Sequence, residues 1–371
     1  TAFRQLAELE RERHDPSRPE LAYRAAATTL GTLLGQGREA TALSQMLPKL
    51  PFDLASLPWH EPNYLTQEYA SQGWAPLYVA EMHRRCRVHK LRFRASATLP
   101  ELFDEFLIEN LRPAVLQEAN PDIRQTLLDL ATNKSFRRDL FVHGQLTLSP
   151  QRRAAALAGL SVRLQETPPQ ESYRFPSSFG EIAGNDEAYA CLEQALSSGP
   201  LSLGQLQQTT GLPEQEILPM VALLLHVHRL GLDRGEAGRR AAPDCQKVNA
   251  TLLGLMREGA AICHLSAPAI GSAIGFSRLE AFTLEAQAGG LSVPNAAACV
   301  LMGLAGVGQE LRSKSGDPLN DPGERQRQLE EIGARLSQQR LPQLRSLGVF
   351  ATQPATAPTT SGSRKRRTIE P

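Results

Sequence analysis

The sequence predicts a mainly α-helical protein with short β elements, organised as two lobes. Alanine and leucine recur at helical spacing through much of the chain, and only short stretches alternate as strands do. Residues 186–232 follow the order helix, short helix, glycine turn and long helix, as in helix-turn-helix units. We recognise no complete doubly wound α/β domain, which needs a strand, a glycine turn and a helix in succession.

The composition is near the average for globular chains and excludes several classes of protein. The 371 residues suggest about two to three domains. Forty basic and 39 acidic residues leave a net charge of +1, which does not indicate strong attraction to nucleic acid or anionic membrane. Five widely spaced cysteines without a C-x-x-C pattern favour neither a disulfide framework nor a zinc site, so we expect a cytoplasmic protein. No apolar run reaches the roughly 18 residues of a membrane span.

The first 50 residues are expected to form a helical linker. Helices are predicted over 2–13, 20–34 and 39–47, with a break at 15–19 where two prolines occur. Four prolines within 48–62 predict an irregular connector. The chain opens on a charged helical stretch without a signal-peptide pattern, and we therefore expect it to be the later part of a longer protein.

Residues 51–146 form a second helical unit in this interpretation. Its patterns predict helices over 76–87, 99–110, 112–119 and 122–132, with a short strand over 90–97 and strand entry at 141–142. Residues 147–185 are expected to be a connector, and 186–350 a domain that contains the helix-turn-helix and a hairpin or wing over 265–277. Residues 351–371 are predicted to be a disordered tail that ends in basic residues.

The basic residues of 84–94 have two possible structural roles. A nucleic-acid surface would use them on phosphates. However, Lys90, Arg92 and Arg94 alternate with Leu91 and Phe93, which is typical of the solvent side of a half-buried strand. We favour the strand, with an acidic protein surface as an intermediate alternative. Carboxylates at the start of the predicted long helix 213–230 would also repel DNA phosphates there.

Three further groups are candidates for chemistry. Gly303, Gly306 and Gly308 have the wrong spacing for a nucleotide loop, so we favour a helix end. The Arg137-Arg138-Asp139 run is able to clamp an anion, but we favour an internal ion-pair network. Polar-tipped aromatics gather around one carboxylate in Tyr64, Glu68, Tyr69 and Trp74; without a second carboxylate at fixed spacing, we favour helix packing over acid–base catalysis.

Two ordered stretches resemble the methyltransferase regulatory domain family. The first is Asn63-Tyr64-Leu65-Thr66-Gln67-Glu68-Tyr69 followed by Trp74-Ala75-Pro76-Leu77-Tyr78, in which Gln67 stands where the family usually has His. The second runs from Asp122-Ile123-Arg124-Gln125 to Phe136-Arg137-Arg138-Asp139-Leu140-Phe141-Val142. Later segments, such as Leu265-Ser266-Ala267-Pro268 and Leu341-Pro342, resemble a C-terminal winged-helix module of bacterial protein-lysine methyltransferases.

This resemblance implies a regulatory domain at 51–146 and a winged-helix-containing domain at 186–350 in a class I S-adenosylmethionine-dependent methyltransferase. It implies that cofactor and catalytic residues belong to a methyltransferase domain upstream or on another chain, so we expect no cofactor on this chain alone. Tyr64, Glu68, Trp74, Arg137, Arg138 and Asp139 become interface candidates. Expected partners are that domain, a protein substrate and a second copy of the chain. The alternatives are a stand-alone winged-helix nucleic-acid binder and a scaffold.

Overall fold

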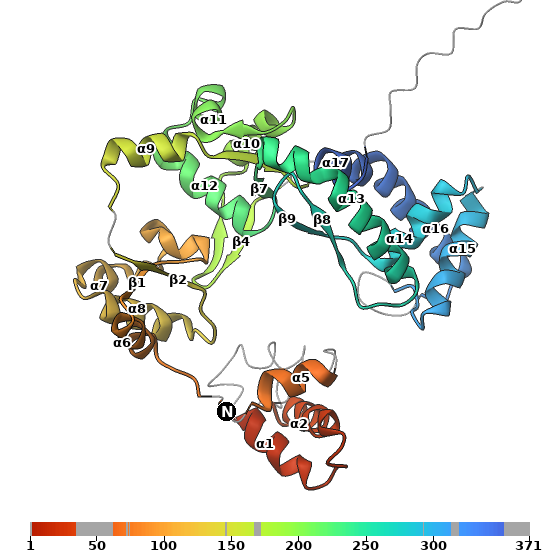
Figure 1. Ribbon diagram of the computed structural model, residues 1–371, viewed down its shortest axis with the longest axis horizontal. Helices are drawn as coiled ribbons and strands as arrows, with labels where there is room; N and C mark the ends of the chain where they lie inside the picture. The colour runs from red at the N-terminus through yellow and green to blue at the C-terminus, as the bar shows by residue number, and fades with distance from the viewer. Residues whose placement is uncertain are drawn as a thin grey trace, which may run out of the picture. The chain divides into compact units, whose positions relative to one another are not determined.

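The computed structural model describes residues 2–34, 62–71, 73, 75–144, 147–166, 172–291, 293–312 and 319–351. It divides into two compact units, Thr1–Met82 and His83–Pro371 (Figure 1). The boundary falls within 51–146, the range predicted as one domain. The predicted helix 39–47, Trp74 and the tail from 352 lie outside the described residues.

The first unit contains three described helices, α1 (Ala2–Arg11), α2 (Pro19–Leu34) and α5 (Pro62–Tyr69). The predicted break between the first two is confirmed, because Asp15 Oδ1 accepts hydrogen bonds from the backbone and hydroxyl of Ser17 at 2.8 and 2.7 Å. The core that α1 and α2 form includes Phe3, Tyr23 and small side chains. Alanines let the two helices approach closely around the tyrosine ring.

The second unit starts within α6 (Val79–Val88) with a two-stranded sheet and short helices. Strands β1 (Leu91–Ser96) and β2 (Asp139–His143) pair antiparallel. Between them lie the 3₁₀ turns η3 (Leu99–Leu102) and η4 (Asp104–Phe106) and the helices α7 (Arg112–Gln117) and α8 (Pro121–Thr132). The predicted helix over 99–110 is wrong, because Phe103 is extended and separates two short turns.

The middle of the second unit packs helices against a three-stranded antiparallel sheet. Its elements are α9 (Pro150–Ala158), β3 (Ser161–Leu164), β4 (Arg174–Ser177), β5 (Gly180–Ala183), α10 (Asp186–Leu196), β6 (Leu201–Ser202), α11 (Leu203–Thr210), α12 (Glu214–His226) and β7 (Leu230–Leu232). The sheet order is β6-β3-β7. Thus the central strand precedes the three helices α10 to α12, and the prediction of a connector over 147–185 missed a helix and three strands.

The predicted helix-turn-helix order is present in α10, α11 and α12. Ser202 and Gln205 form a capping box at the start of α11, and Gly211 ends it with a φ of 70°. Pro219 lies inside α12, which nevertheless continues to His226. The third strand of the sheet is β3, which precedes the helices in the sequence, and not a strand that follows β7. The winged-helix assignment therefore stays a prediction.

The C-terminal part of the second unit surrounds a β-hairpin with helices. Its elements are α13 (Gly235–Arg257), β8 (His264–Ala267), β9 (Ser272–Gly275), α14 (Arg278–Ala288), α15 (Val293–Gly306), α16 (Pro322–Arg335), the π-helical turn η5 (Leu336–Arg340) and α17 (Leu341–Ser346). The hairpin within 265–277 is confirmed. Asn249, 1% exposed, donates hydrogen bonds to the carbonyls of Ser266 and Val349 and so joins the helix, the hairpin and the last apolar segment.

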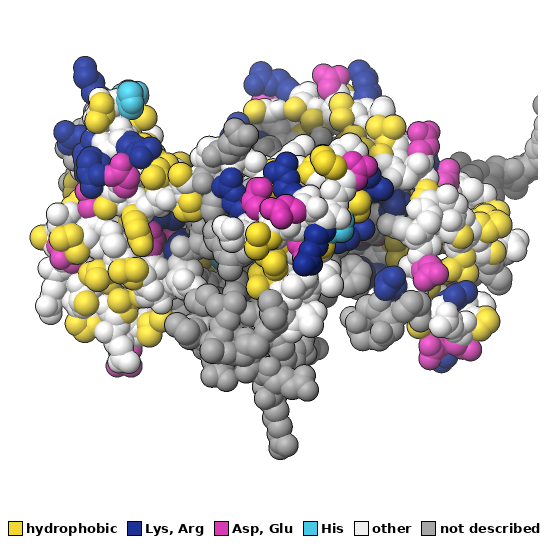
Figure 2. All heavy atoms as spheres, turned by 90° about the horizontal axis from the view of Figure 1, so that it is seen from below, with side chains coloured by type: hydrophobic (Ala, Val, Ile, Leu, Met, Phe, Trp, Pro, Cys, Tyr) yellow, Lys and Arg dark blue, Asp and Glu magenta, His cyan; other side chains and the backbone are white. Residues whose placement is uncertain are grey.

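The secondary structure agrees with the mainly α prediction, and the surface agrees with the balanced charge of the sequence. In the described part, the largest sheet has three strands and every strand pairing is antiparallel, so a doubly wound parallel sheet is absent there. No helix among these residues combines the length and apolarity needed to cross a bilayer. Charged side chains of both signs are interspersed with hydrophobic ones on the face in Figure 2, which fits the net charge of +1.

A buried ion pair lies in the core between α10 and β7. Glu193, 1% exposed, accepts hydrogen bonds from two nitrogens of Arg229 at 2.5 and 2.7 Å and from the hydroxyl of Tyr173 at 2.8 Å. This arrangement satisfies both carboxylate oxygens within an apolar surrounding. Removal of Glu193 would leave the buried Arg229 with only Glu166, 3.7 Å away and 57% exposed, as counter-charge.

We expect Glu193→Ala to lower the free energy of unfolding by about 3–5 kcal/mol, because Arg229 would remain buried and charged. Urea unfolding followed by circular dichroism measures this loss. Glu236→Ala is the control, since the Glu236–Arg239 pair is more than two-thirds exposed on each side and should contribute little. Equal effects of the two substitutions would contradict the prediction.

Candidate functional site

Arg137 forms the ion-pair network that the sequence predicted. Its guanidinium donates to both carboxylate oxygens of Asp139 at 2.8 and 2.9 Å, to Asp129 and to the Gln125 amide oxygen at 2.8 Å. Asp129 and Gln125 lie on α8, whereas Asp139 starts β2. Burial raises the pKa of Asp129, and the neighbouring Arg137 opposes this rise. The network therefore fixes β2 against α8 and uses four of the five N–H donors of Arg137 within the fold.

Arg138 does not join this network. Its side chain is exposed, and its backbone carbonyl accepts a hydrogen bond from the Ala97 amide at 2.7 Å. Alternation along the chain explains the difference, because neighbouring residues of an extended segment face opposite sides. The structure thus brings together two members of the predicted trio and directs the third to solvent.

A second polar network, which the sequence analysis missed, lies beside the first. Asp122 at the start of α8 contacts Nδ1 of His83 at 2.8 Å and accepts from two nitrogens of Arg87 at 3.1 and 2.7 Å. The hydrogen bond from Arg87, together with that from His83, lowers the pKa of Asp122 to about 2. His83 and Arg87 are four residues apart on α6, so both reach the same carboxylate; that spacing was the signal available in the sequence.

His83 is buried between aromatic rings. Its imidazole stacks on Phe93 of β1 with centroids 4.6 Å apart and meets the edge of Phe141 of β2 at 5.7 Å. Nε2 of His83 has no hydrogen-bond partner among the described residues. The two phenyl rings lie on the inner face of the β1–β2 sheet. Phe93 is therefore on the half-buried side of the strand, and Arg92 and Arg94 face solvent, which confirms the prediction of a half-buried strand.

A third cluster connects this part to the β4–β5 hairpin. Glu101 on η3 pairs with Lys134 and accepts hydrogen bonds from the hydroxyls of Ser96 at 2.7 Å and Ser178 at 2.9 Å. Ser178 lies in the hairpin turn. In Figure 1 the hairpin runs from the helices α10 to α12 down to the β1–β2 sheet. Glu101 therefore joins two parts of the second unit through side chains far apart in the sequence.

Tyr64 and Glu68 lie on α5 of the first unit. Tyr64 is 46% exposed and Glu68 is also exposed. Trp74 falls outside the described residues. Tyr64 and Glu68 belong to the first unit, whereas the Arg137 network belongs to the second. Their interface role stays a prediction.

The glycine pattern in α15 has a packing role. A Cβ on Gly303 would lie 2.5 Å from the Phe282 ring, so this glycine allows α15 to approach α14. Gly308 has a φ of 68° just beyond the helix end, which confirms the helix-end interpretation. No strand leads into this turn, so these residues do not fit the phosphate or ribose contacts of a nucleotide cofactor. Within the described chain, no group of three His, Cys, Asp or Glu residues is arranged to hold a metal ion.

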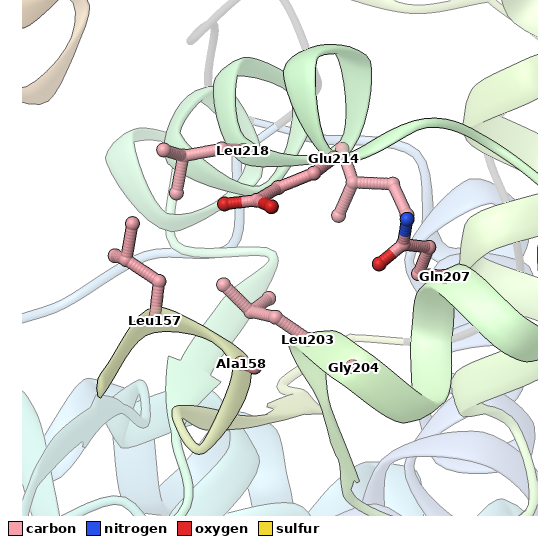
Figure 3. A pocket seen from close by; sticks show the side chains of 8 residues that line it. Leu157, Ala158, Leu203, Gly204, Gln207, Glu214 and Leu218 are labelled. Atoms are coloured by element: carbon pink, nitrogen blue, oxygen red, sulfur yellow. The ribbon is translucent and has the colours of Figure 1, made fainter. Parts of the chain in front are cut away.

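A small cavity lies between α9, α11 and α12 (Figure 3). Leu157, Leu203 and Leu218 line it, and the Glu214 carboxylate points across it. Its volume of about 30 Å³ is sufficient for roughly one or two waters, but not for a substrate. Glu214 and Glu216 occupy the first turn of α12, where they suit the helix dipole and would repel a nucleic-acid backbone.

We expect Arg137→Ala to destabilise the fold by about 3–5 kcal/mol, because two partly buried carboxylates lose their counter-charge. Arg138→Ala is the matched control and should have almost no effect, since the side chain is exposed. Arg137→Lys should recover only part of the loss. The ammonium restores the positive charge, but it cannot make the bidentate contact to Asp139. Thermal unfolding of the three variants gives the ranking, and a loss in Arg138→Ala as large as in Arg137→Ala would contradict it.

Asp122 predicts an acid-sensitive contribution to stability. Its pKa of about 2 in the fold lies below the ordinary 3.8, so the folded state binds fewer protons in this interval. The contribution, at most about 2 kcal/mol, should be complete well above pH 3.8, fall as the pH drops towards 2 and vanish below that. Urea unfolding of the wild type and Asp122→Asn between pH 5 and about 2 tests this. Curves that stay parallel through the interval would refute it.

Part of the chain matches a family model among known proteins. Residues 61–143 match the family model described as a predicted methyltransferase regulatory domain. An uncharacterized protein of Synechocystis, sll1526, is 27% identical over 293 residues, which cover 77% of this chain and 57% of that protein. The chain thus spans little more than half the length of this curated relative.

Two solved structures share the fold. Both are of PKMT2 from Rickettsia typhi, one of them in complex with AdoHcy, with TM-scores of 0.54 and 0.52 at 12% sequence identity. The similarity covers 94% of this chain and 71–72% of the PKMT2 chains. The order of motifs around Tyr64 and Arg137, the network built on Arg137 and the family match agree. Residues 61–143 thus match the model of predicted methyltransferase regulatory domains, within a chain that shares the fold of PKMT2.

Proposed function

We propose that this chain is the regulatory and substrate-recognition portion of an S-adenosylmethionine-dependent methyltransferase that acts on protein lysines. The observation that carries the proposal is the match of residues 61–143 to the regulatory-domain family. The shared fold with PKMT2, which extends over 94% of the chain, supports the same assignment for the remaining parts. The lysine specificity rests on the resemblance of the C-terminal segments to protein-lysine methyltransferases.

The partner in this proposal is a methyltransferase domain, either upstream in the same protein or on another chain. Three observations support it. The glycine turn after α15 does not fit the cofactor, the strand pairings in the described part are antiparallel, and the chain covers 71% of the PKMT2 chain with AdoHcy. S-adenosylmethionine is thus the cofactor of the parent enzyme, and the residues described here act on the acceptor protein.

The physical role of such a portion is to hold the acceptor. Methyl transfer requires the attacking nitrogen to lie in line with the departing group, and orientation of the reactants can account for several kcal/mol of the barrier. The networks around Arg137, Asp122 and Glu101 make the β1–β2 sheet rigid relative to α6 and α8. A rigid surface loses little entropy on binding a flexible polypeptide, so it is suited to positioning an acceptor segment.

The test compares methyl transfer by the partner methyltransferase domain with and without this chain. We expect transfer of labelled methyl groups from S-adenosylmethionine to protein lysines to fall by at least about tenfold when the chain is absent, since orientation is lost. S-adenosylmethionine binding by the partner domain, measured by calorimetry, should remain. Mass spectrometry identifies the methylated residue.

Two controls make the result specific. The Arg137→Ala variant, provided that it is folded, should stimulate transfer less than Arg152→Ala, which removes an exposed arginine of α9 away from the β1–β2 sheet. Calorimetric titration of this chain alone with S-adenosylmethionine should give no micromolar binding. Equal transfer with and without the chain, or tight cofactor binding to the chain itself, would overturn the proposal.

A further inference from the structure

The outer face of the β1–β2 sheet combines basic and apolar side chains. Arg92 lies opposite Val142 in the register, and a bulge places Arg94 and Ala95 opposite Leu140. The bulge keeps both Phe93 and Ser96 towards the interior while Arg92 and Arg94 face solvent. Phe136 and Arg138 precede β2 and are also exposed. We call these six residues, Arg92, Arg94, Phe136, Arg138, Leu140 and Val142, the arginine–apolar patch.

The arginines of this patch have no acidic partner in the described part of the chain. No ion pair or side-chain hydrogen bond joins Arg92, Arg94 or Arg138 to a carboxylate there, and all three are exposed. Arg87 and Arg137, a few residues away in sequence, each bind carboxylates within the fold. The charges of the patch are thus available to a partner, and complementarity requires that partner to be acidic.

The apolar members of the patch restrict the partner further. Phe136 is 75% exposed, Leu140 52% and Val142 40%. Leu140 and Val142 offer nothing to phosphates. Phe93 and Phe141 pack inward around His83, so within the six residues of the patch Phe136 alone has a ring that could stack on a base, whereas single-stranded nucleic acid binds to several such rings. A protein segment with acidic and apolar side chains therefore fits this surface better than a nucleic acid does.

The backbone provides a way to bind such a segment. The β1–β2 sheet has two strands, so each strand has an outer edge without a ladder partner in the described residues. An extended peptide can pair with such an edge through main-chain hydrogen bonds, and its alternate side chains then lie on one face. Beside β2, these side chains would lie next to Leu140 and Val142, with the arginines across the sheet.

We propose that the arginine–apolar patch binds an extended polypeptide segment in which acidic and apolar residues alternate, and that this segment belongs to the methyl-acceptor protein. The identification of the segment as part of the acceptor rests on the proposed function; the binding chemistry does not. The segment lies along β2, pairs its carboxylates with Arg92, Arg94 and Arg138, and covers Leu140 and Val142.

The test measures binding to the full chain by fluorescence anisotropy at low salt. The probes are a short labelled peptide in which Glu alternates with Val or Leu, the same peptide with Lys in place of Glu, and single-stranded oligothymidylate. We expect the acidic peptide to bind and the lysine peptide not to bind. Arg92→Glu combined with Arg94→Glu should weaken binding by at least about tenfold, because attraction becomes repulsion. Amide hydrogen exchange over 139–143 should slow when the acidic peptide is present.

Arg152→Glu combined with Arg153→Glu is the matched control, since both residues are exposed on α9 and lie outside the patch. This variant should bind within about twofold of the wild type, as expected for charges away from the contact. Absence of binding by the acidic peptide, equal weakening in both double variants, or tighter binding of oligothymidylate would overturn the inference. Because no methyltransferase is present in this assay, such a failure leaves the transfer experiment of the proposed function unaffected.

Discussion

The Arg137 guanidinium, shared by three side chains on two elements, is the constraint on which the packing of β2 against α8 depends. Asp139 begins β2, and Asp129 and Gln125 lie on α8, so one planar cation determines both the start of the strand and its distance from the helix. Burial would make each carboxylate costly if it were unpaired. The register of β2 on β1 follows, because Asp139 lies opposite Ser96 and both face the interior.

Two phenylalanines join the β1–β2 part of the second unit to its middle part, because each packs against the core of the other part. Phe106 of η4 packs against the core around Leu192 and Leu224, while Phe179 from the β4–β5 turn packs against the small core of Leu107, Val115 and Leu128. Glu101 adds a polar connection through Ser178. Each part therefore completes the core of the other, and separation of the two would expose apolar surface on both sides.

The helical character and the elements with strong local signals were predictable from the sequence. The periodicity of 122–132 predicted α8, and the order helix, short helix, glycine turn and long helix over 186–232 predicted α10, α11 and α12. Strands β3, β4 and β5 were missed because they are four residues long and lie in a polar stretch. Their partners, β6 and β7 for β3, are distant in sequence, and local patterns contain no information about such pairing.

For the site, the sequence identified Arg137 and Asp139 as a network because opposite charges at short spacing seldom remain unpaired. The roles of His83 and Asp122 depend on the packing of α6 against α8, 39 residues apart, which sequence spacing cannot reveal. Arg138 shows the converse limit. Its neighbour Arg137 forms two ion pairs, whereas Arg138 faces solvent, because adjacent residues of an extended segment point to opposite sides.

The position of β3 has a consequence for how this module can be inherited. The middle strand of the β6-β3-β7 sheet is provided by residues before the first of the three helices, so the helices and their sheet do not form a contiguous cassette starting at α10. A recombination event that joined a foreign gene at Asp186 would separate both outer strands from their common partner. Transfer of this module with an intact three-stranded sheet therefore requires β3 as well as the helices.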